Sequence, residues 1–367
     1  MVYIIRTIVL FMIGLWLKNQ FKEELSFKSI KIVMMQVFLP AVIFYLILTN
    51  KEGISENGLW MIVVATLALN FLTFGFAKFV LPKLLPSLGK KIINTNAVML
   101  SDYAPCITVV PIAAAISTNV NATYAALFDI GDKFFIFVIL FAYISLQVQE
   151  KSAGFLQNAS YFLKKIILQP INLALILSLV LSSQNIVFED LPTVVQQVIV
   201  DIKAPLLILI PIFIAGVVSF ENLSKTLLSV LMYKYGFGFV ISGIFLLLFP
   251  GVISAGLGLL VVTAPLASSS MWAKQNLTEF NQKKVSQKFD LDFADDLFSN
   301  SFGISLILNF LIFSIGEPIV NSNLLLILGF SLMVTASTLY YRSRKAERKA
   351  RLMAAEVLTQ KEFALRK

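Results

Sequence analysis

The chain has 367 residues, of which 58% are hydrophobic, and it carries a net charge of +9. Its mean hydropathy of +0.84 excludes an ordinary soluble domain. Apolar runs of about 20 residues recur, which is the length that a helix needs to cross about 30 Å of hydrocarbon. There is no histidine and only one cysteine, Cys106. An intrachain disulfide is therefore excluded, and carboxylates, amides, hydroxyls or backbone carbonyls would have to carry any coupled proton or cation.

The apolar runs predict an all-α polytopic membrane protein with eleven spans and little soluble mass. We expect the first run to be a retained span rather than a signal peptide, because no small-residue cleavage site follows it. The expected spans are residues 2–17, 29–49, 59–81, 94–116, 122–147, 166–182, 202–219, 227–249, 251–272, 300–316 and 322–340.

The connections between the expected spans lie alternately on the two sides of the membrane, and most lysines fall on one side. The connections after spans 1, 3, 5 and 9 hold Lys18, Lys22, Lys28, Lys83, Lys90, Lys91, Lys151, Lys164, Lys165, Lys274, Lys283, Lys284 and Lys288. The opposite connections hold Lys51, Glu52, Glu56, Glu189, Asp190 and Glu317. By the positive-inside rule, this places the N-terminus outside and the C-terminus in the cytoplasm of a cell (inner) membrane.

The two halves of the chain are weakly similar to each other. Pro40 in span 2 corresponds to Pro205 in span 7, and Pro105 in span 4 corresponds to Pro265 in span 9. Five spans is an odd number, so the second copy would insert upside down. Paired broken helices in an inverted repeat point to a transport site near the membrane midplane. The alternative is that proline is simply common in membrane helices.

The sequence suggests five units, the last of which is strongly basic. From Arg342 on there are nine Lys or Arg and three Glu, so this tail carries +6 of the chain's charge. We expect a solvated continuation of the last span, and contact with anionic lipid or a protein partner is the alternative. The units are residues 1–150 (first repeat), 151–165 (cytoplasmic connection), 166–318 (second repeat), 319–341 (extra span) and 342–367 (basic tail).

Four segments resemble the auxin efflux carrier family of permeases, which includes bacterial malate-type permeases and the plant PIN proteins. They are "FLPAVIF" in span 2, "NATYAALFDIGDKFF" after the span-4 prolines, "IKAPLLILIPIFIAG" in span 7 and "TAPLASSSMWAKQN" in span 9. The resemblance implies that spans 4 and 9 are unwound and cross, with solute held at the crossing. It also implies a scaffold of spans 1, 2, 6 and 7 and a transport domain that moves as an elevator. The eleventh span and the basic tail are additions to that pattern.

The proline-broken spans supply the candidate substrate site. A break frees backbone N–H and C=O groups that lipid cannot satisfy, so the segment must face protein or a water-filled cavity. Free N–H groups at the start of a half-helix favour an anion, and free carbonyls favour a cation. Packing between helices is the alternative role for the serines. The candidate residues are Asp102, Pro105, Thr108, Pro111, Pro265, Ser268, Ser269 and Ser270.

Three carboxylates are candidates for proton or Na⁺ coupling, namely Asp102, Asp129 and Asp132. Lys133 follows Asp129 by four residues, so the two share a helix face and are predicted to pair. Asp132 would then be the freer carboxylate. For Asp102, the alternative is a residue in contact with water at the cytoplasmic end of its span.

Other polar residues are expected to be structural. Arg6 and Lys234 would snorkel or pair, Asn70 and Asn309 would form hydrogen bonds between helices, and Cys106 would be a small apolar filler. The acidic run lacks the spacing of a calcium-binding loop, so we expect a solvated connection. That run is Asp290, Asp292, Asp295 and Asp296. No metal site and no cofactor are expected.

The leading hypothesis is a secondary transporter for a small organic anion rather than an enzyme. No GxxxxGK[ST] loop is present, which argues against direct use of ATP. The expected partners are the organic anion and membrane lipid but no nucleic acid, and a homodimer is left open. One alternative is a transporter-like sensor or scaffold whose tail binds a partner. Another is an aspartyl intramembrane protease, because "FDIGD" ends in Asp132, although the glycine and the tyrosine–aspartate pair of that class are missing.

The lysine alternation predicts that the tail from Arg342 lies in the cytoplasm. A reporter that is active only in the cytoplasm should therefore be active when it is fused after Lys367 and silent at the N-terminus. The opposite pattern would rule out the eleven-span topology.

Overall fold

The computed structural model describes residues 2–20, 32–50, 56–116, 119–148, 168–217, 223–251, 257–269 and 271–365. These ranges contain helices and one isolated β-bridge, but no β-strand. Five helical stretches in them are long and apolar enough to cross a membrane, which confirms the prediction of an all-α membrane protein. The eleven spans and the inverted repeat stay predictions. The five stretches are Met61–Leu84, Thr193–Phe213, Lys225–Leu248, Leu291–Ile315 and Ser322–Ala346.

Among the described residues of the first half of the chain, three π-helical segments continue α-helices. Such segments often lie near functional sites. In chain order, the elements are α1 (Val2–Gln20), η1 (Met34–Phe38), α3 (Leu39–Thr49), α4 (Glu56–Gly75), η3 (Phe76–Val80), α5 (Leu81–Leu84), α6 (Lys90–Leu100), α7 (Pro105–Thr108), α8 (Val110–Ile116), α9 (Asn119–Phe134), η4 (Phe135–Leu140) and α10 (Phe141–Val148).

The second half of the chain ends in its longest helix. In chain order, the elements are α12 (Pro170–Ser183), η5 (Phe188–Asp190), α13 (Thr193–Lys203), α14 (Leu206–Val217), α15 (Lys225–Leu248), α17 (Gly258–Thr263), η6 (Ala264–Leu266), α18 (Met271–Glu279), α19 (Gln282–Lys288), α20 (Leu291–Ile315), η7 (Glu317–Ile319) and α21 (Ser322–Leu365).

Two expected spans begin earlier than the sequence predicted. The seventh was placed at residues 202–219, but the apolar stretch begins at Thr193, where Pro192 leads into α13. The tenth was placed at 300–316, but α20 begins at Leu291, because the Asp290 side chain accepts the Phe293 N–H and caps the helix. Polar residues in the first turns hid both helix starts from a search for apolar runs.

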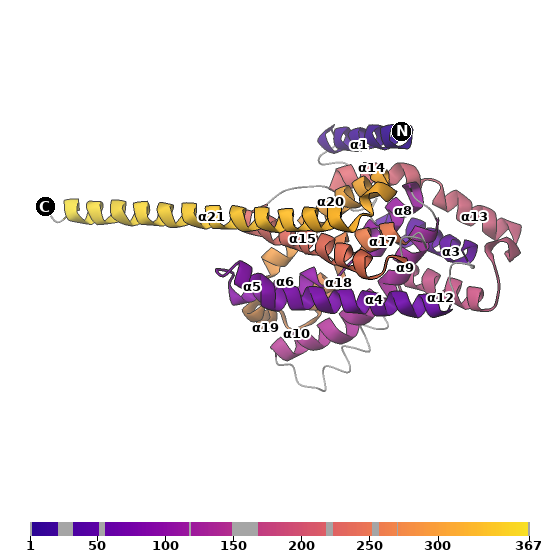
Figure 1. Cartoon of the computed structure of the whole chain (residues 1–367), viewed down its shortest axis with the longest axis horizontal. Helices are drawn as coiled ribbons and strands as arrows, with labels where there is room; N and C mark the ends of the chain where they lie inside the picture. The colour runs from indigo at the N-terminus through magenta and orange to yellow at the C-terminus, as the bar shows by residue number, and fades with distance from the viewer. Residues whose placement is uncertain are drawn as a thin grey trace.

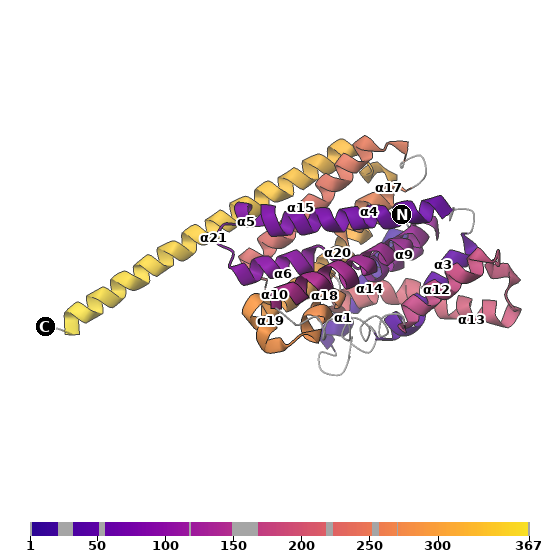
Figure 2. The same cartoon turned by 90° about the horizontal axis from the view of Figure 1, so that it is seen from below.

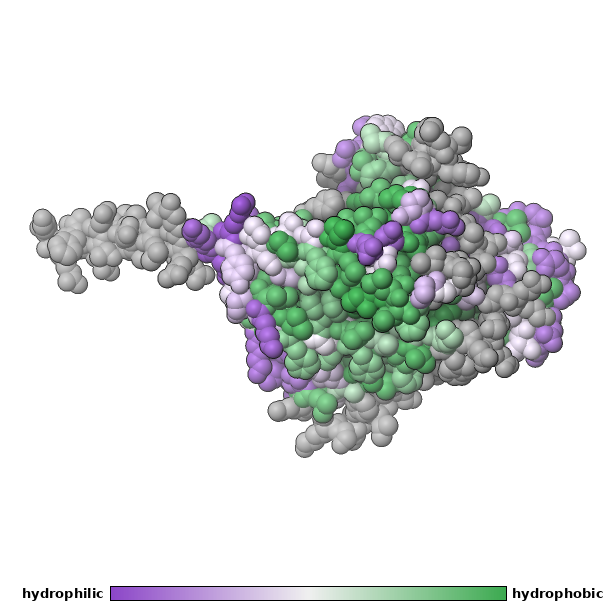
Figure 3. Space-filling model, viewed as in Figure 1, coloured by the Kyte–Doolittle hydropathy of each residue, from purple (hydrophilic) through white to green (hydrophobic). Residues whose placement is uncertain are grey.

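The helices form one bundle, from which α21 projects (Figures 1 and 2). Figure 3 shows hydrophobic residues over the middle of one face and hydrophilic residues towards both of its ends. Large apolar side chains are exposed on this protein, for example Met61, Phe79 and Val334. Exposed apolar surface of this extent is expected where a helix contacts lipid.

The added helix α21 packs along α15, and glycines allow their backbones to approach closely. A Cβ atom at Gly329 would lie 2.6 Å from the carbonyl oxygen of Gly236, and one at Gly236 would lie 2.9 Å from that of Gly329. The hydroxyls of Tyr233 and Ser337 also hydrogen-bond across this interface. Helix α21 is therefore fixed to α15.

Gly329→Ala should lower the stability of the purified protein by about 1–3 kcal/mol, because the new methyl group meets backbone that cannot yield. The matched control is Gly75→Ala in α4, where an added Cβ has no atom within 4 Å. Thermal unfolding in detergent measures both changes. Equal midpoints for the two variants would contradict the close α15–α21 contact.

Candidate functional site

Span 4 is broken just before its prolines. Helix α6 ends at Leu100 and α7 begins at Pro105, so residues 101–104 leave the helical conformation. Proline disfavours helical geometry in the residue before it, and Ala104 accordingly has φ −125° and ψ 64°. The sequence placed the break between Pro105 and Pro111. The helix is interrupted there at Val109, but the longer unwound stretch precedes Pro105. Pro105 begins α7 and Pro111 lies in the first turn of α8, where a missing N–H costs little.

Span 9 is broken just after its proline. Pro265 lies within η6, and residues 267–269, which follow η6, are not helical. The two breaks meet, because Tyr103 and Ser269 form an antiparallel β-bridge. The Ala104 N–H also donates to the Ser268 carbonyl at 3.0 Å. Backbone groups that the breaks release are thus satisfied partly by each other.

A side chain from α9 holds the first break. The Tyr103 N–H donates to Asp132 Oδ1 at 3.0 Å, and Asn70 Nδ2 on α4 donates to the same oxygen at 2.9 Å. Asn70 therefore forms the hydrogen bond between helices that the sequence predicted. Asn309, by contrast, donates to Ser305 on its own helix, α20.

A side chain from α20 holds the second break. The Ser269 N–H donates to Ser301 Oγ at 3.2 Å. The Tyr235 hydroxyl on α15 donates to the Ser301 carbonyl at 2.8 Å. The two breaks are therefore held in the same way. Each is bound by a side chain of the helix that follows it, Asp132 on α9 or Ser301 on α20. That residue in turn accepts a hydrogen bond from the helix that precedes the break, through Asn70 on α4 or Tyr235 on α15.

Asp102 is buried at the crossing, with 0% of its surface exposed. The alternative of a water-contacting residue at the end of the span is therefore wrong. Its Oδ2 accepts the Ala273 N–H at 2.8 Å, in the first turn of α18, where backbone donors lack helical partners. The carboxyl groups of Asp102 and Asp132 also interact with each other. Part of the anion-binding capacity of this helix end is thus taken up by the protein's own carboxylate.

Lys234 is the site residue that sequence reasoning missed. It lies in α15 and is 2% exposed, so it does not snorkel to an interface. Its Nζ donates to Ser269 Oγ at 3.1 Å and lies 5.5 Å from the centre of the Tyr103 ring. The carboxylates of Asp102 and Asp132 both attract its positive charge. The available signal was a lysine ten residues into a 24-residue apolar helix that contains no acidic residue.

The remaining candidates differ in how they contact the breaks. Thr108 Oγ1 donates to the Ala104 carbonyl at 2.9 Å, and the Ser268 N–H lies 3.5 Å from the same hydroxyl. The Ser268 hydroxyl is buried and has no hydrogen-bond partner among the residues that the structure describes. Pro265 is buried and shapes the backbone. Ser270 lies outside the described residues.

The Asp129–Lys133 ion pair predicted from their spacing is present. Lys133 also donates to the side chain of Asn172 on α12, which ties α9 to a neighbouring helix. Asp129 is therefore neutralised within its own helix, whereas Asp132 contacts the crossing. Cys106 is buried near Asp129.

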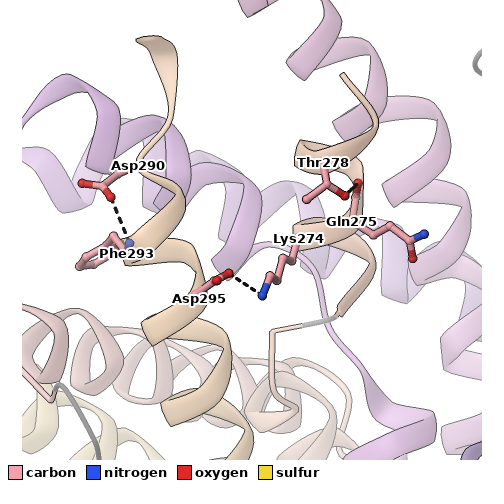
Figure 4. Close-up of polar contacts among 6 residues, drawn as sticks. All are labelled: Lys274, Gln275, Thr278, Asp290, Phe293 and Asp295. Carbon is pink, nitrogen blue, oxygen red and sulfur yellow. Dashed lines mark hydrogen bonds and ion pairs between the residues drawn. The ribbon is translucent and has the colours of Figure 1, made fainter. Parts of the chain in front are cut away.

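The acidic run at the start of α20 has structural contacts (Figure 4). Asp290 accepts the Phe293 N–H at 3.0 Å, and Asp295 forms an ion pair of 2.6 Å with Lys274 on α18. These contacts connect the half-helix after the second break to α20. The expectation of a connection is wrong, because Asp292, Asp295 and Asp296 lie within α20. Asp292 and Asp295 are nevertheless exposed, as expected of a solvated segment.

An apolar cavity of about 210 Å³ lies beside the second break. Its walls come from α4, α9, α15, α17 and η6, and they include Ala264 and Pro265. Ser242 is its one polar lining residue, and that hydroxyl donates to the carbonyls of Gly238 and Val261. The cavity therefore suits hydrocarbon and offers nothing to hold a charge.

Comparisons of the sequence with protein-family models and with curated proteins gave no match.

Proposed function

We propose that the chain is a secondary transporter of the cell membrane for a small organic anion, which binds where the two broken helices meet. The observation that carries this proposal is the buried ammonium of Lys234, bonded to Ser269 at the Tyr103–Ser269 bridge. A cation inside the membrane is costly and usually marks a solute or ion pathway. Unwound backbone at the same place is typical of transporter binding sites.

A carboxylate is the solute group that this arrangement favours. Lys234 can give up its bond to the neutral Ser269 hydroxyl for a stronger, charge-assisted bond to an anion. The Ser268 hydroxyl is buried beside the same bridge and can donate a further hydrogen bond. Small mono- and dicarboxylates therefore form the first class to test.

The charges at the crossing support coupling to a proton or Na⁺. If Asp102, Asp132 and Lys234 are all ionised, the group carries one net negative charge in a buried place. Two interacting carboxylates do not both stay charged without a compensating proton or cation. A bound anion adds further negative charge to be compensated. The binding of the anion and the binding of a proton or Na⁺ would therefore favour each other.

The contacts around the breaks support an inverted repeat. Residues on a two-fold axis contact their own equivalents, and Tyr103 pairs with Ser269. Asp132 and Ser301 then play equivalent parts, since each accepts the N–H of the break in its own half. Tyr103 and Ser269, like Asp132 and Ser301, are separated by nearly the same number of residues as Pro40 and Pro205. The elevator mechanism and the place in the auxin efflux carrier family are part of this proposal.

A transporter-like sensor or scaffold is the second candidate. It is favoured by α21, whose 44 residues continue past the bundle and present a basic tail (Figures 1 and 2). A sensor would bind the solute without moving it. Binding to the purified protein combined with no uptake into vesicles would therefore favour this candidate.

The contact between Asp102 and Asp132 also resembles the carboxyl pair of an aspartyl protease. Catalysis of that kind needs two carboxyls that share a water molecule. Here Asp102 accepts the Ala273 N–H, and Asp132 accepts the Tyr103 N–H and the Asn70 amide. Both side chains thus hold helix breaks together, which favours transport over proteolysis.

Lys234→Gln should weaken carboxylate binding by roughly 10–100-fold, because a charge-assisted hydrogen bond contributes about 1.5–3 kcal/mol. The matched control is Lys203→Gln. Lys203 lies on α13, where its ammonium contacts the ring of Tyr45 on α3, away from the breaks. Thermal-shift titration over a panel of mono- and dicarboxylates measures affinity. Uptake into vesicles, with and without a pH or Na⁺ gradient, measures transport.

The proposal would fail if Lys234→Gln and wild type bound the same carboxylate equally well. It would also fail if no carboxylate in the panel changed the unfolding midpoint of wild type. A loss of binding in Lys203→Gln as large as that in Lys234→Gln would assign the effect to general lysine loss.

A further inference from the structure

The positive charge of α21 is concentrated where the helix leaves the membrane. Its apolar residues end at Tyr341, just before Arg342, and a helix of 44 residues is about 66 Å long, roughly twice the hydrocarbon thickness. Residues 342–351 contain six Lys or Arg and one Glu, whereas residues 352–367 contain three and two. Most of the charge therefore lies within about 15 Å of the end of the span.

A second basic segment is fixed to α21 at this level. The Ser87 N–H donates to the Tyr340 hydroxyl at 3.1 Å, and the two side-chain hydroxyls also hydrogen-bond. Arg344 Nη2 donates to the Ser87 carbonyl at 3.3 Å. The turn that contains Ser87 is flanked by Lys83 and Lys90, both exposed. Five cationic side chains thus surround the exit of α21, and we call them the collar: Lys83, Lys90, Arg342, Arg344 and Lys345.

We propose that the collar binds anionic phospholipid headgroups of the cytoplasmic leaflet. Its residues directly adjoin lipid-facing surface. Phe79 lies one turn before Lys83 and is 64% exposed, and Tyr341 lies beside Arg342 and is 57% exposed. Cations next to exposed apolar and aromatic side chains lie at headgroup depth. Clusters of this size immediately cytoplasmic of a span attract anionic lipid.

The local charge balance agrees with an anionic partner at the membrane rather than in solution. The sequence has no Asp or Glu from Phe76 to Ser101, so the collar's lysines have no acidic residue on their own segment. Figure 3 shows hydrophilic residues gathered where α21 leaves the bundle. A nucleic acid or an acidic protein would bind more readily to positive charge along the projecting end of α21. Residues 352–367 at that end carry a net charge of only +1.

Headgroup binding would act on the helix that carries the site lysine. One face of α15 contacts α21 through Tyr233 and Gly236. The other face contacts the second break through Lys234. Lipid that holds α21 therefore also biases the position of Lys234. This regulatory consequence rests on the proposed function, whereas lipid binding itself does not.

Thermal unfolding of the full-length protein in detergent tests the proposal, with short-chain phosphatidylglycerol as the probe and phosphatidylcholine as the neutral control. We expect phosphatidylglycerol to raise the midpoint of wild type, and added salt to reduce this shift. Replacing the five collar residues with Gln should weaken phosphatidylglycerol binding at least about tenfold.

The matched control replaces five other cytoplasmic-side cations with Gln and should keep the lipid effect. These are Lys283, Lys284, Lys361, Arg366 and Lys367. If the full collar variant does not fold, Lys83→Gln/Lys90→Gln removes only two exposed charges and should still weaken binding.

Three results would overturn the proposal. The first is an equal effect of the two lipids on wild type. The second is an equal loss of binding in the collar and control variants. The third is an RNA oligomer that stabilises wild type as strongly as phosphatidylglycerol and displaces it, which would assign the collar to nucleic acid.

Discussion

A backbone segment that leaves the helical conformation at membrane depth must find its hydrogen-bond partners within the protein. This constraint governs the centre of the molecule. The two unwound segments satisfy it through the Tyr103–Ser269 bridge, and Asp132 and Ser301 accept the N–H groups of the bridge residues. Helices α9 and α20 must therefore lie where these side chains reach the crossing. The arrangement is polar and buried, and the proposed function requires that some of its contacts be exchanged for a solute.

Helix α15 connects the crossing to the rest of the bundle. Lys234 and Tyr235 face the second break, while Tyr233 and Gly236 face α21. One helix thus carries Lys234 and the contacts that hold α21. Close-packed helices have few intermediate arrangements, so a shift of α15 at its contact with α21 would also move the residues that face the second break. Under the proposed function, this connection is the route by which α21 would act on the site.

Much of this architecture follows from the sequence, and the exceptions have a common cause. Proline content identified the two broken spans, and i, i+4 spacing identified the Asp129–Lys133 pair, because both depend on local geometry. The longer unwound stretch lies before Pro105 rather than between the two prolines, since proline acts on the residue before it. The helix-capping role of Asp102 and the importance of Lys234 were missed, because their partners lie far along the chain.

The central claim is that the two breaks meet, and a cross-link between them tests it most directly. The variant carries Tyr103→Cys and Ser269→Cys in a Cys106→Ser background, with a protease site inserted between Lys151 and Lys164. Paired residues of antiparallel backbone lie within disulfide range. After mild oxidation in membranes and proteolysis, the two halves should stay joined until a reductant is added. Halves that separate without reductant would contradict the account.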